Sequence, residues 1–377
     1  MGKRELVLIA VFLAVGIVVY QFTAPPPPPG SAGVSVGGIF QKLKREIHGA
    51  RENATAESKA SLSVDPSIRL VRINLPRAND LTVVGTDASD VTVEMRVTAR
   101  GYDQAAAKAA ADAARVTLET VGDAVVASST WSNTRNNADG FVAQSTITLS
   151  VPRRLSVRLE PHIGELIVRD VAGVELMGSR GDTEITGTSG PIVLTHGGGK
   201  LTIDRAASLK FTGRNSEGTI KNIAGTFSMD ITSGELRIQD VVGPIDIEAR
   251  NNELQFDAAK TSKPPFRFNG TGGQLRVDNL KSEARIDGRN VDLEVELSGA
   301  APITIYSTGS DITVTAPPGG YSIDAVATDG RLVLNDGTLK AADEHDQRVT
   351  GAVRGGGAAL TLRATRADIR LRKPEGK

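Results

Sequence analysis

The unit that decides the fold reads GELIV at residues 164–168 and GELRI at residues 234–238. In each copy a glycine or a small polar residue precedes alternating polar and apolar side chains. Alternation with a period of two is typical of β-strands and not of helices. Between residues 164 and 373 the further copies are GDTEI (181–185), GKLTI (199–203), GTIKN (218–222), NELQF (252–256), GQLRV (273–277), VDLEV (291–295), SDITV (310–314) and GRLVL (330–334).

These copies return at an even spacing. Their first inward positions lie 16 to 21 residues apart, and a self-similar period of about 20 residues is typical of solenoid proteins. The positions are Leu166, Thr183, Leu201, Ile220, Leu236, Leu254, Leu275, Leu293, Ile312 and Leu332.

Most copies carry a second short strand some eight to ten residues later. An insertion at residues 258–265 delays this second strand in one copy, to Phe266 and Phe268. The other second strands place these pairs inward: Val174 and Leu176, Ile192 and Leu194, Leu209 and Phe211, Phe227 and Met229, Ile245 and Ile247, Ala284 and Ile286, Ile303 and Ile305, and Tyr321 and Ile323.

The repeat predicts a mainly β chain, built as a parallel β-helix or solenoid of short 16–21-residue rungs. Each rung adds apolar side chains to a common interior, and its backbone pairs with the rungs on either side. At about 4.8 Å per rung, ten or eleven rungs give a rod of about 50 Å. Ile247 is expected to face the interior, in one column with Met229 and Phe268. An antiparallel sandwich with regular turns is the alternative fold.

The composition of the 377 residues excludes several classes of protein. Forty glycines against nine Phe, four Tyr and one Trp suit a turn-rich repeat with small interior residues. Lys plus Arg equals Asp plus Glu, at 44 each, so no overall field selects nucleic acid as a partner. The chain has no cysteine, which excludes disulfides and thiolate metal sites.

Residues 1–24 predict an N-terminal transmembrane helix. Lys3 and Arg4 precede an uncharged run of 17 residues at 6–22, the lower limit for crossing a bilayer. The site for signal cleavage is poor, which favours an uncleaved anchor over a cleaved signal peptide. The positive-inside rule keeps the N-terminus in the cytoplasm and exports the rest. The expected location is the cell membrane, single-pass, with the C-terminal domain periplasmic or extracellular.

Two further segments precede the repeat domain at 161–373. Residues 25–60 predict a linker, which begins with five prolines and continues as a polar stalk whose basic residues either stay in solvent or touch lipid headgroups. Residues 61–160 predict a strand-rich α+β cap with one helix at 102–120. At the far end, the arginines of residues 363–372 are expected to block pairing at a terminal edge.

The VP turn at residues 151–152, the GELIV, GDTEI and GELRI units and the closing GGGAALTLRATRADIRL resemble one family. It is the bacterial putative-adhesin family of uncharacterised function, whose members repeat units such as SGDVEV. The resemblance covers roughly residues 65–373. It implies a β-helical protein of the cell envelope, often membrane-anchored and sometimes linked to envelope-stress systems, and it brings no catalytic residues.

A search for catalytic, cofactor and metal sites in the sequence assigns none. Residues 33–37 match G-x-S-x-G formally, but they lie in the linker and not on a strand-to-helix turn. Residues 196–200, HGGGK, either cradle an anion or form a corner of a rung. The four histidines lack ligand spacing and are expected to be solvated or loop residues: His48, His162, His196 and His345.

Outward carboxylates are the remaining candidates for chemistry, because β-helices also carry polysaccharide-cleaving enzymes. Glycoside cleavage needs two carboxyl groups about 5 to 10 Å apart across a groove. Alternation alone produces such pairs on any acidic strand, so a solvated face is the simpler interpretation. The acidic sets are Asp182 and Glu184, Asp246 and Glu248, and Asp292, Glu294 and Glu296.

The outward positions of the first strands favour solubility or broad, weak contact with a partner. Together with the predicted anchor and with what the family resemblance implies, they lead us to expect a non-catalytic, adhesin-like binding protein of the bacterial envelope, whose partner is an unknown envelope protein or glycan. A self-associating scaffold stacked end to end and a polysaccharide-active enzyme are the alternatives. The outward positions of the first strands form a row that comprises Glu184, Thr202, Lys221, Arg237, Gln255, Arg276 and Glu294.

Overall fold

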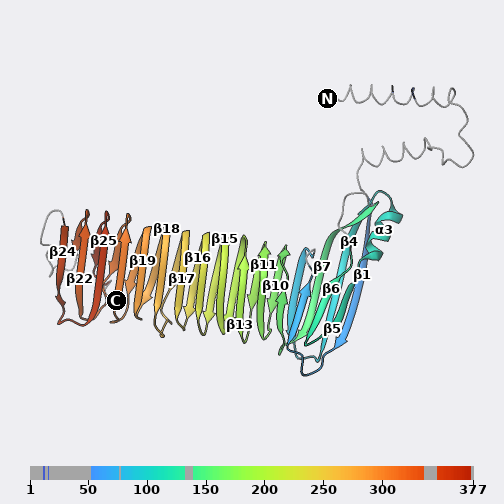
Figure 1. Cartoon of the computed structure of the whole chain (residues 1–377), viewed down its shortest axis with the longest axis horizontal. Coiled ribbons are helices and arrows are strands. Elements are labelled where there is room, and N and C mark those ends of the chain that lie inside the picture. The colour runs from blue at the N-terminus through green and yellow to red at the C-terminus, as the bar shows by residue number, and fades with distance from the viewer. Residues whose placement is uncertain are drawn as a thin grey trace, which may run out of the picture.

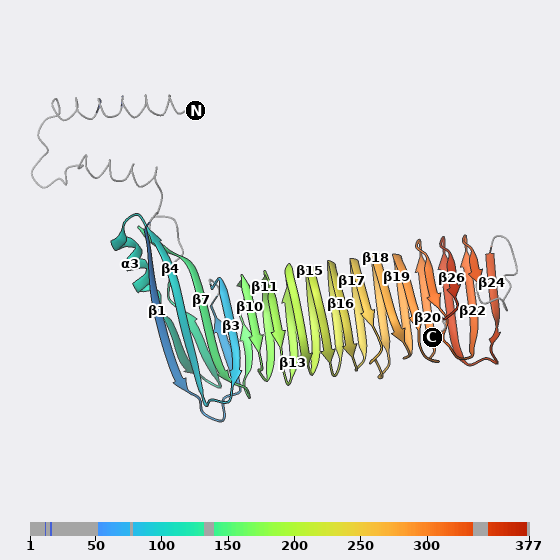
Figure 2. The same ribbon diagram turned by 180° about the vertical axis from the view of Figure 1, so that it is seen from behind.

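The chain forms an elongated array of strands in the computed structural model (Figure 1). The structure describes residues 52–75, 78–131, 139–334 and 346–374, together with Phe12 and Gly16. Within these residues the protein is mainly β, as predicted, and all strands belong to one continuous sheet. The strands stand side by side from the blue end beside helix α3 to β24 at the red end (Figure 1 and Figure 2).

Strand pairing separates the sheet into two ladders, each a row of hydrogen-bonded strands. In the middle of the first ladder the strands are parallel and keep one register, so that Phe227 lies opposite Ile245 and Ile245 opposite Phe266. In spatial order this ladder contains β5 (Val116–Val121), β6 (Ala124–Ser129), β2 (Leu70–Asn74), β8 (Ser156–Leu159) with β9 (His162–Ile163), β11 (Gly173–Arg180), β13 (Pro191–His196), the first halves of β15 (Ser208–Ile223), β16 (Phe227–Val241), β17 (Ile245–Asp257), β18 (Phe266–Leu280) and β19 (Ala284–Leu297), and then β20 (Ile303–Thr308), β25 (Ala358–Thr365), β22 (Tyr321–Thr328) and β24 (Asp346–Val353).

The second ladder takes the other half of each unit. Leu236 lies opposite Leu254, and Leu254 opposite Leu275, again in parallel register. In spatial order it contains β1 (Glu52–Ser63), β4 (Asp90–Gly101), β7 (Gly140–Pro152), β3 (Asp80–Thr86), β10 (Glu165–Arg169), β12 (Thr183–Thr186), β14 (Gly199–Ala206), the second halves of β15 to β19, and then β21 (Ile312–Thr315), β26 (Ile369–Arg372) and β23 (Leu332–Leu334).

Strands β15 to β19 run through both ladders and bend once between them. The bend falls at a residue with positive φ, a conformation that glycine and asparagine adopt most readily. Register aligns these residues in a column along the array, the corner column: Asn215, Ser233, Asn251, Gly272 and Asn290. A second column of positive φ follows the second ladder, at Asp170, Gly187, Arg205, Asn222 and Asp240.

Inward side chains of the two ladders meet in one apolar core. Phe256 of the second ladder packs edge-on against Phe227 and Phe266 of the first ladder, with ring centroids 6.4 and 5.2 Å apart. All three rings are fully buried. Aromatic pairs at this separation and angle stabilise a core by about 0.5–1.5 kcal/mol beyond the area that they bury. The inward faces of the two ladders therefore lie against each other.

The inward pairs predicted for the second strand of each unit are buried in the first ladder. The insertion at residues 258–265 lies between β17 and β18 and delays the second strand of its unit, as predicted, while the pairing register is kept, because Ile245 pairs with Phe266. Ile247 is fully buried and lies in register with Met229 and Phe268. The expected column is thus confirmed.

In one copy the predicted inward register is wrong. Gly218, and not Ile220, lies opposite Leu201. Gly218 has a φ of +148°, and a Cβ at this position would lie 1.9 Å from the carbonyl oxygen of Leu201. A side chain is excluded there, so the copy has no apolar residue to mark its first inward position. The outward row consequently contains Thr219 where the sequence predicts Lys221.

The region before the repeats differs from its prediction at two places. Helix α3 (Gln104–Ala113) begins at Asp103, whose carboxylate accepts a hydrogen bond from the Ala106 amide at 2.8 Å. The helix ends well before residue 120, because the β-branched Val116 and Thr117 start β5, which pairs with β6. Residues 52–60, assigned to the linker by sequence, belong to β1, which pairs with β4.

Both ends of the array depart from chain order. β25 and β26 lie between β20 and β21 on one side and β22 and β23 on the other. At the opposite end, β2 and β3 lie between β6 and β7 on one side and β8 and β10 on the other. Antiparallel strands then complete the ladders, with β24 on β22, β5 on β6, and β4 and β1 beyond β7.

The arginines of β25 and β26 therefore do not line an open edge, contrary to the sequence prediction. Arg363 pairs with Asp324 of β22, and Arg370 pairs with Asp311. Their charges pair with carboxylates of neighbouring units, because the strands that carry them lie inside the array and not at its end.

The predicted anchor at residues 1–24 lies outside the described residues, apart from Phe12 and Gly16. The same holds for the linker before β1. Among the residues that the structure describes, no helix has the length and apolar character needed to cross a membrane.

Candidate binding surface

Outward positions of the second ladder form rows that run along the array. Side chains alternate across a strand, and parallel register places equivalent positions about 4.8 Å apart. The first row holds Lys200, Glu217, Glu235, Glu253, Gln274 and Asp292. The middle row holds Glu184, Thr202, Thr219, Arg237, Gln255, Arg276 and Glu294. The mixed polar face expected from the sequence is present in these rows.

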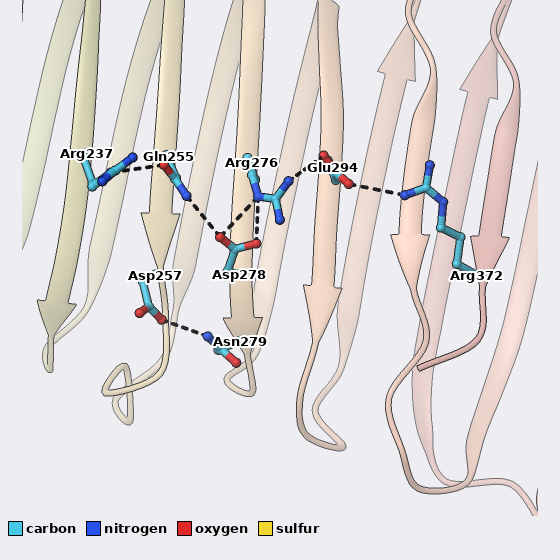
Figure 3. A network of polar contacts seen from close by, with 8 residues as sticks. All are labelled: Arg237, Gln255, Asp257, Arg276, Asp278, Asn279, Glu294 and Arg372. Atoms are coloured by element: carbon cyan, nitrogen blue, oxygen red, sulfur yellow. Dashed lines mark hydrogen bonds and ion pairs between the residues drawn. The ribbon is translucent and has the colours of Figure 1, made fainter. Parts of the chain in front are cut away.

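Side chains of the middle row bind one another across units (Figure 3). Glu294 accepts hydrogen bonds from Arg276 at 3.2 Å and from Arg372 at 3.4 Å. Arg276 also donates to Asp278 at 2.9 Å. Exposed pairs of this kind contribute about 0–1 kcal/mol each, so they order the face more than they stabilise the fold. The chain of contacts continues from Asp278 through Gln255 to Arg237.

Two shallow hollows lie on this face, where the middle row holds threonine instead of a long side chain. Their volumes are about 160 and 350 Å³, and Lys200 lines both. Carboxylates and ammonium or guanidinium groups surround them, which suits hydrogen bonding to a polar partner. The first is lined by Glu165, Ile167, Asp182, Glu184, Lys200 and Thr202, and the second by Lys200, Glu217, Gly218, Thr219, Glu235 and Arg237, with Leu166 and Thr183 at the base of the first.

The structure separates the carboxylates that the sequence singles out. Asp182 and Glu184 line the first hollow, where Arg169 donates to Glu184 at 2.8 Å and the Lys200 amide donates to Asp182 at 3.0 Å. Glu294 bridges two arginines, as described above. Asp246 and Glu248 lie on the first ladder, and Asp292 and Glu296 are exposed on the second. Each set stays on its own strand, as alternation dictates.

His162 and His196 are buried, contrary to the expectation of solvated or loop positions. The ring Nε2 of His196 donates to the Gly181 carbonyl at 3.0 Å, which leaves Nδ1 to accept from the Ser216 hydroxyl at 2.7 Å. Nε2 of His162 donates to the Glu165 carbonyl at 3.2 Å, and its buried Nδ1 has no partner among the described residues. Burial lowers the pKa of both rings.

These histidines occupy one inward column beside the corner, with Ser179 between them. The burial of His196 could have been predicted from the alternation of β13. Ile192, Leu194 and His196 are alternate residues and therefore share the inward face. The His196 ring binds the backbone of Gly181 and the side chain of Ser216, and Gly198 and Gly199 after it have positive φ. The stretch HGGGK therefore forms the corner between β13 and β14.

The remaining candidates lie elsewhere. Residues 33–37, His48 and His345 are outside the described residues. Within the described ranges, no group of three or more His, Asp or Glu side chains is placed to hold a metal ion.

No protein-family model matches the chain, and no curated protein sequence matches it. Three solved structures are similar over 85% of this chain: a putative cell adhesion protein from Clostridium sporogenes (9% identity, 100% of that chain, TM-score 0.22), a putative adhesin from Parabacteroides merdae (8%, 96%, 0.29) and a putative adhesin from Bacteroides fragilis (9%, 98%, 0.19). At these TM-scores none of the three overlays closely on this chain.

Proposed function

We propose that the chain is an exported, membrane-anchored β-helical binding protein of the bacterial cell envelope, which acts by contact and not by catalysis. The observation that carries this proposal is the outward face of the second ladder. It offers regular rows of polar side chains over many units, with two open hollows. Many modest contacts along such a face add up to useful affinity.

The β-helical architecture is part of the proposal. Each unit adds one segment to each ladder, turns at a residue with positive φ, and advances by one strand. The contact of Phe256 with both Phe227 and Phe266 supports two ladders wound around a shared interior. In this view, α3 with β1, β4 and β7 forms the cap of the first rung, where an open edge would otherwise invite aggregation.

Membrane anchoring and export rest on the sequence alone. The positive charges of Lys3 and Arg4, the apolar run after them and the proline-rich spacer support a rod held away from the bilayer. The expected partner is a protein or glycan of the envelope, and nucleic acid is not expected.

Binding and turnover are to be assayed together on the full chain. We expect envelope extracts to contain a component that the parent protein retains, and a panel of envelope polysaccharides to stay uncleaved. Glu294→Gln removes an acceptor of two arginines and should weaken retention by less than about threefold, since exposed pairs contribute little.

Glu248→Gln, on the first ladder, is the matched control for the same chemical change on another face. Removal of a catalytic acid typically lowers a rate by about 100-fold or more. Polysaccharide cleavage by the parent that disappears in either variant would therefore overturn the contact function and establish the polysaccharide-active alternative.

A further inference from the structure

Two rows of opposite charge flank the corner column on neighbouring faces. The arginine row lies at the last outward position of the first ladder, on every second unit: Arg214, Arg250 and Arg289, with Thr232 and Thr271 between them. The acidic row lies at the first outward position of the second ladder: Glu217, Glu235, Glu253 and Asp292, with Gln274 between the last two and Lys200 beside Glu217.

All seven charged side chains are exposed. In the part of the chain that the structure describes, none of them forms an ion pair or a side-chain hydrogen bond, whereas the middle row beside them is linked across units. The charges of these two rows are therefore available to a partner.

The acidic row is also a source of repulsion within the isolated molecule. Glu217, Glu235 and Glu253 stand on adjacent strands in strict register, about 4.8 Å apart. Like charges directly opposite each other on neighbouring strands are destabilising. A partner that places positive charge along this row relieves that repulsion.

We infer that the corner column, with its two rows, is the contact surface for a second copy of this chain, lying parallel and side by side. The inference deepens the proposed function by naming a partner for the same face, and it rests on that proposal. A twofold axis along the array sets the arginine row of each copy against the acidic row of the other, so both rows are satisfied at once. An antiparallel pair would set like rows against each other.

The residues between the rows allow close approach. The corner column consists of Asn, Ser and Gly, whose short side chains leave the longer arginines and glutamates to make the contact. Five units at about 4.8 Å cover a strip about 20 Å long, which is at the small end of specific interfaces. The pair is accordingly weak and sensitive to salt.

Cross-linking in the full chain tests the geometry, since the chain contains no cysteine. Ser233→Cys places one thiol in the corner column, on the twofold axis. Ser228→Cys is the control, five residues earlier on the same strand β16 and away from the corner. With a short bismaleimide, we expect at least about fivefold more dimer from Ser233→Cys than from Ser228→Cys, and a loss of most of it at about 0.5 M NaCl, where exposed charges are screened.

Charge reversal then tests the pairing of the rows. One variant of Ser233→Cys carries Arg214→Glu, Arg250→Glu and Arg289→Glu, and the other carries Glu217→Arg, Glu235→Arg and Glu253→Arg. Each alone should lose the dimer, because its two rows then carry the same sign, apart from Asp292 in the second variant, and a mixture of the two should restore it. All six positions are exposed, and circular dichroism is to be used to check that the variants fold.

Equal cross-linking at positions 233 and 228, no cross-linked dimer from Ser233→Cys, or full cross-linking of either reversed variant alone would overturn the inference. A monomeric chain that still retains an envelope component would overturn this inference and leave the contact function standing. Polysaccharide cleavage together with the expected cross-linking would overturn the contact function and leave the pairing of two copies standing. The two failures are therefore distinguishable.

Discussion

At the scale of single residues, the difference between an inward and an outward position decides the energetics. Ile247 is fully buried, while its neighbour Glu248 is exposed. The strand backbone is the same for both, so the two residues form a matched pair for measuring what burial in this core contributes.

Ile247→Asp should lower the free energy of unfolding by roughly 4 kcal/mol, because it buries a carboxylate with no partner among apolar neighbours. Glu248→Ala should change it by less than about 0.5 kcal/mol. Thermal or denaturant unfolding followed by circular dichroism measures both. Similar losses in the two variants would contradict the inward and outward assignment.

Protonation of the buried histidines is the second prediction at this scale. Burial lowers the pKa of His162 and His196 from the ordinary value of 6.5. Between the lowered pKa and 6.5 the unfolded chain binds more protons than the folded chain, so stability rises with pH in that window. The stability that burial of the neutral rings contributes is complete above pH 6.5 and is lost as the pH falls below it.

The melting temperature should therefore fall on acidification below the ordinary histidine pKa. Carboxylates titrate further down, so the informative measurement compares the parent with His196→Gln, which keeps hydrogen-bonding groups but does not titrate. The variant should show a shallower pH dependence of the melting temperature. A slope equal to that of the parent would contradict the role of His196.

At the scale of elements, alternation and spacing in the sequence were sufficient to place most strands. The pairs from Val174 and Leu176 onward could be predicted, because inward parity depends only on local pattern. The order of strands at the two ends could not. Every unit offers the same backbone groups and a similar apolar stripe, so local sequence does not say which neighbour β25 and β26 choose.

Turn residues also limit what local sequence can predict. Gly218 occupies an inward position that the sequence does not mark, because a glycine has no side chain to show whether it faces inward or outward. The candidate binding surface was predictable as a polar face, from the middle row. The pairing of Glu294 with Arg372 was not predictable, because the two residues are brought together by the placement of β26 inside the array.

Removal of β25 and β26 is the prediction at this scale. A chain ending after residue 354 leaves β20 and β22 without the strand between them. The amides of β22 should then lose their protection from hydrogen exchange, together with those of β20. A chain ending after residue 373 keeps both strands and is the control. Retained protection of β22 in the shorter chain would show that β25 is not needed to hold it.

At the scale of the whole molecule, placement in the cell remains to be measured. If residues 1–24 anchor the chain with its N-terminus in the cytoplasm, protease added to spheroplasts should degrade the array and leave the anchor in the membrane. A cytoplasmic marker protein controls for intact spheroplasts. Full protection of the array would mean the opposite orientation.

The inserted strands at the far end also set an order of events in time. β25 and β26 leave the ribosome after β22, β23 and β24, yet they must occupy the place between those strands and β20 and β21. The earlier strands therefore cannot take up their final pairing when they emerge, and folding of this end waits for the last segment. A chain whose synthesis stops before β25 leaves β20 and β22 without their final pairing and open to proteolysis, so the topology distinguishes complete molecules from incomplete ones.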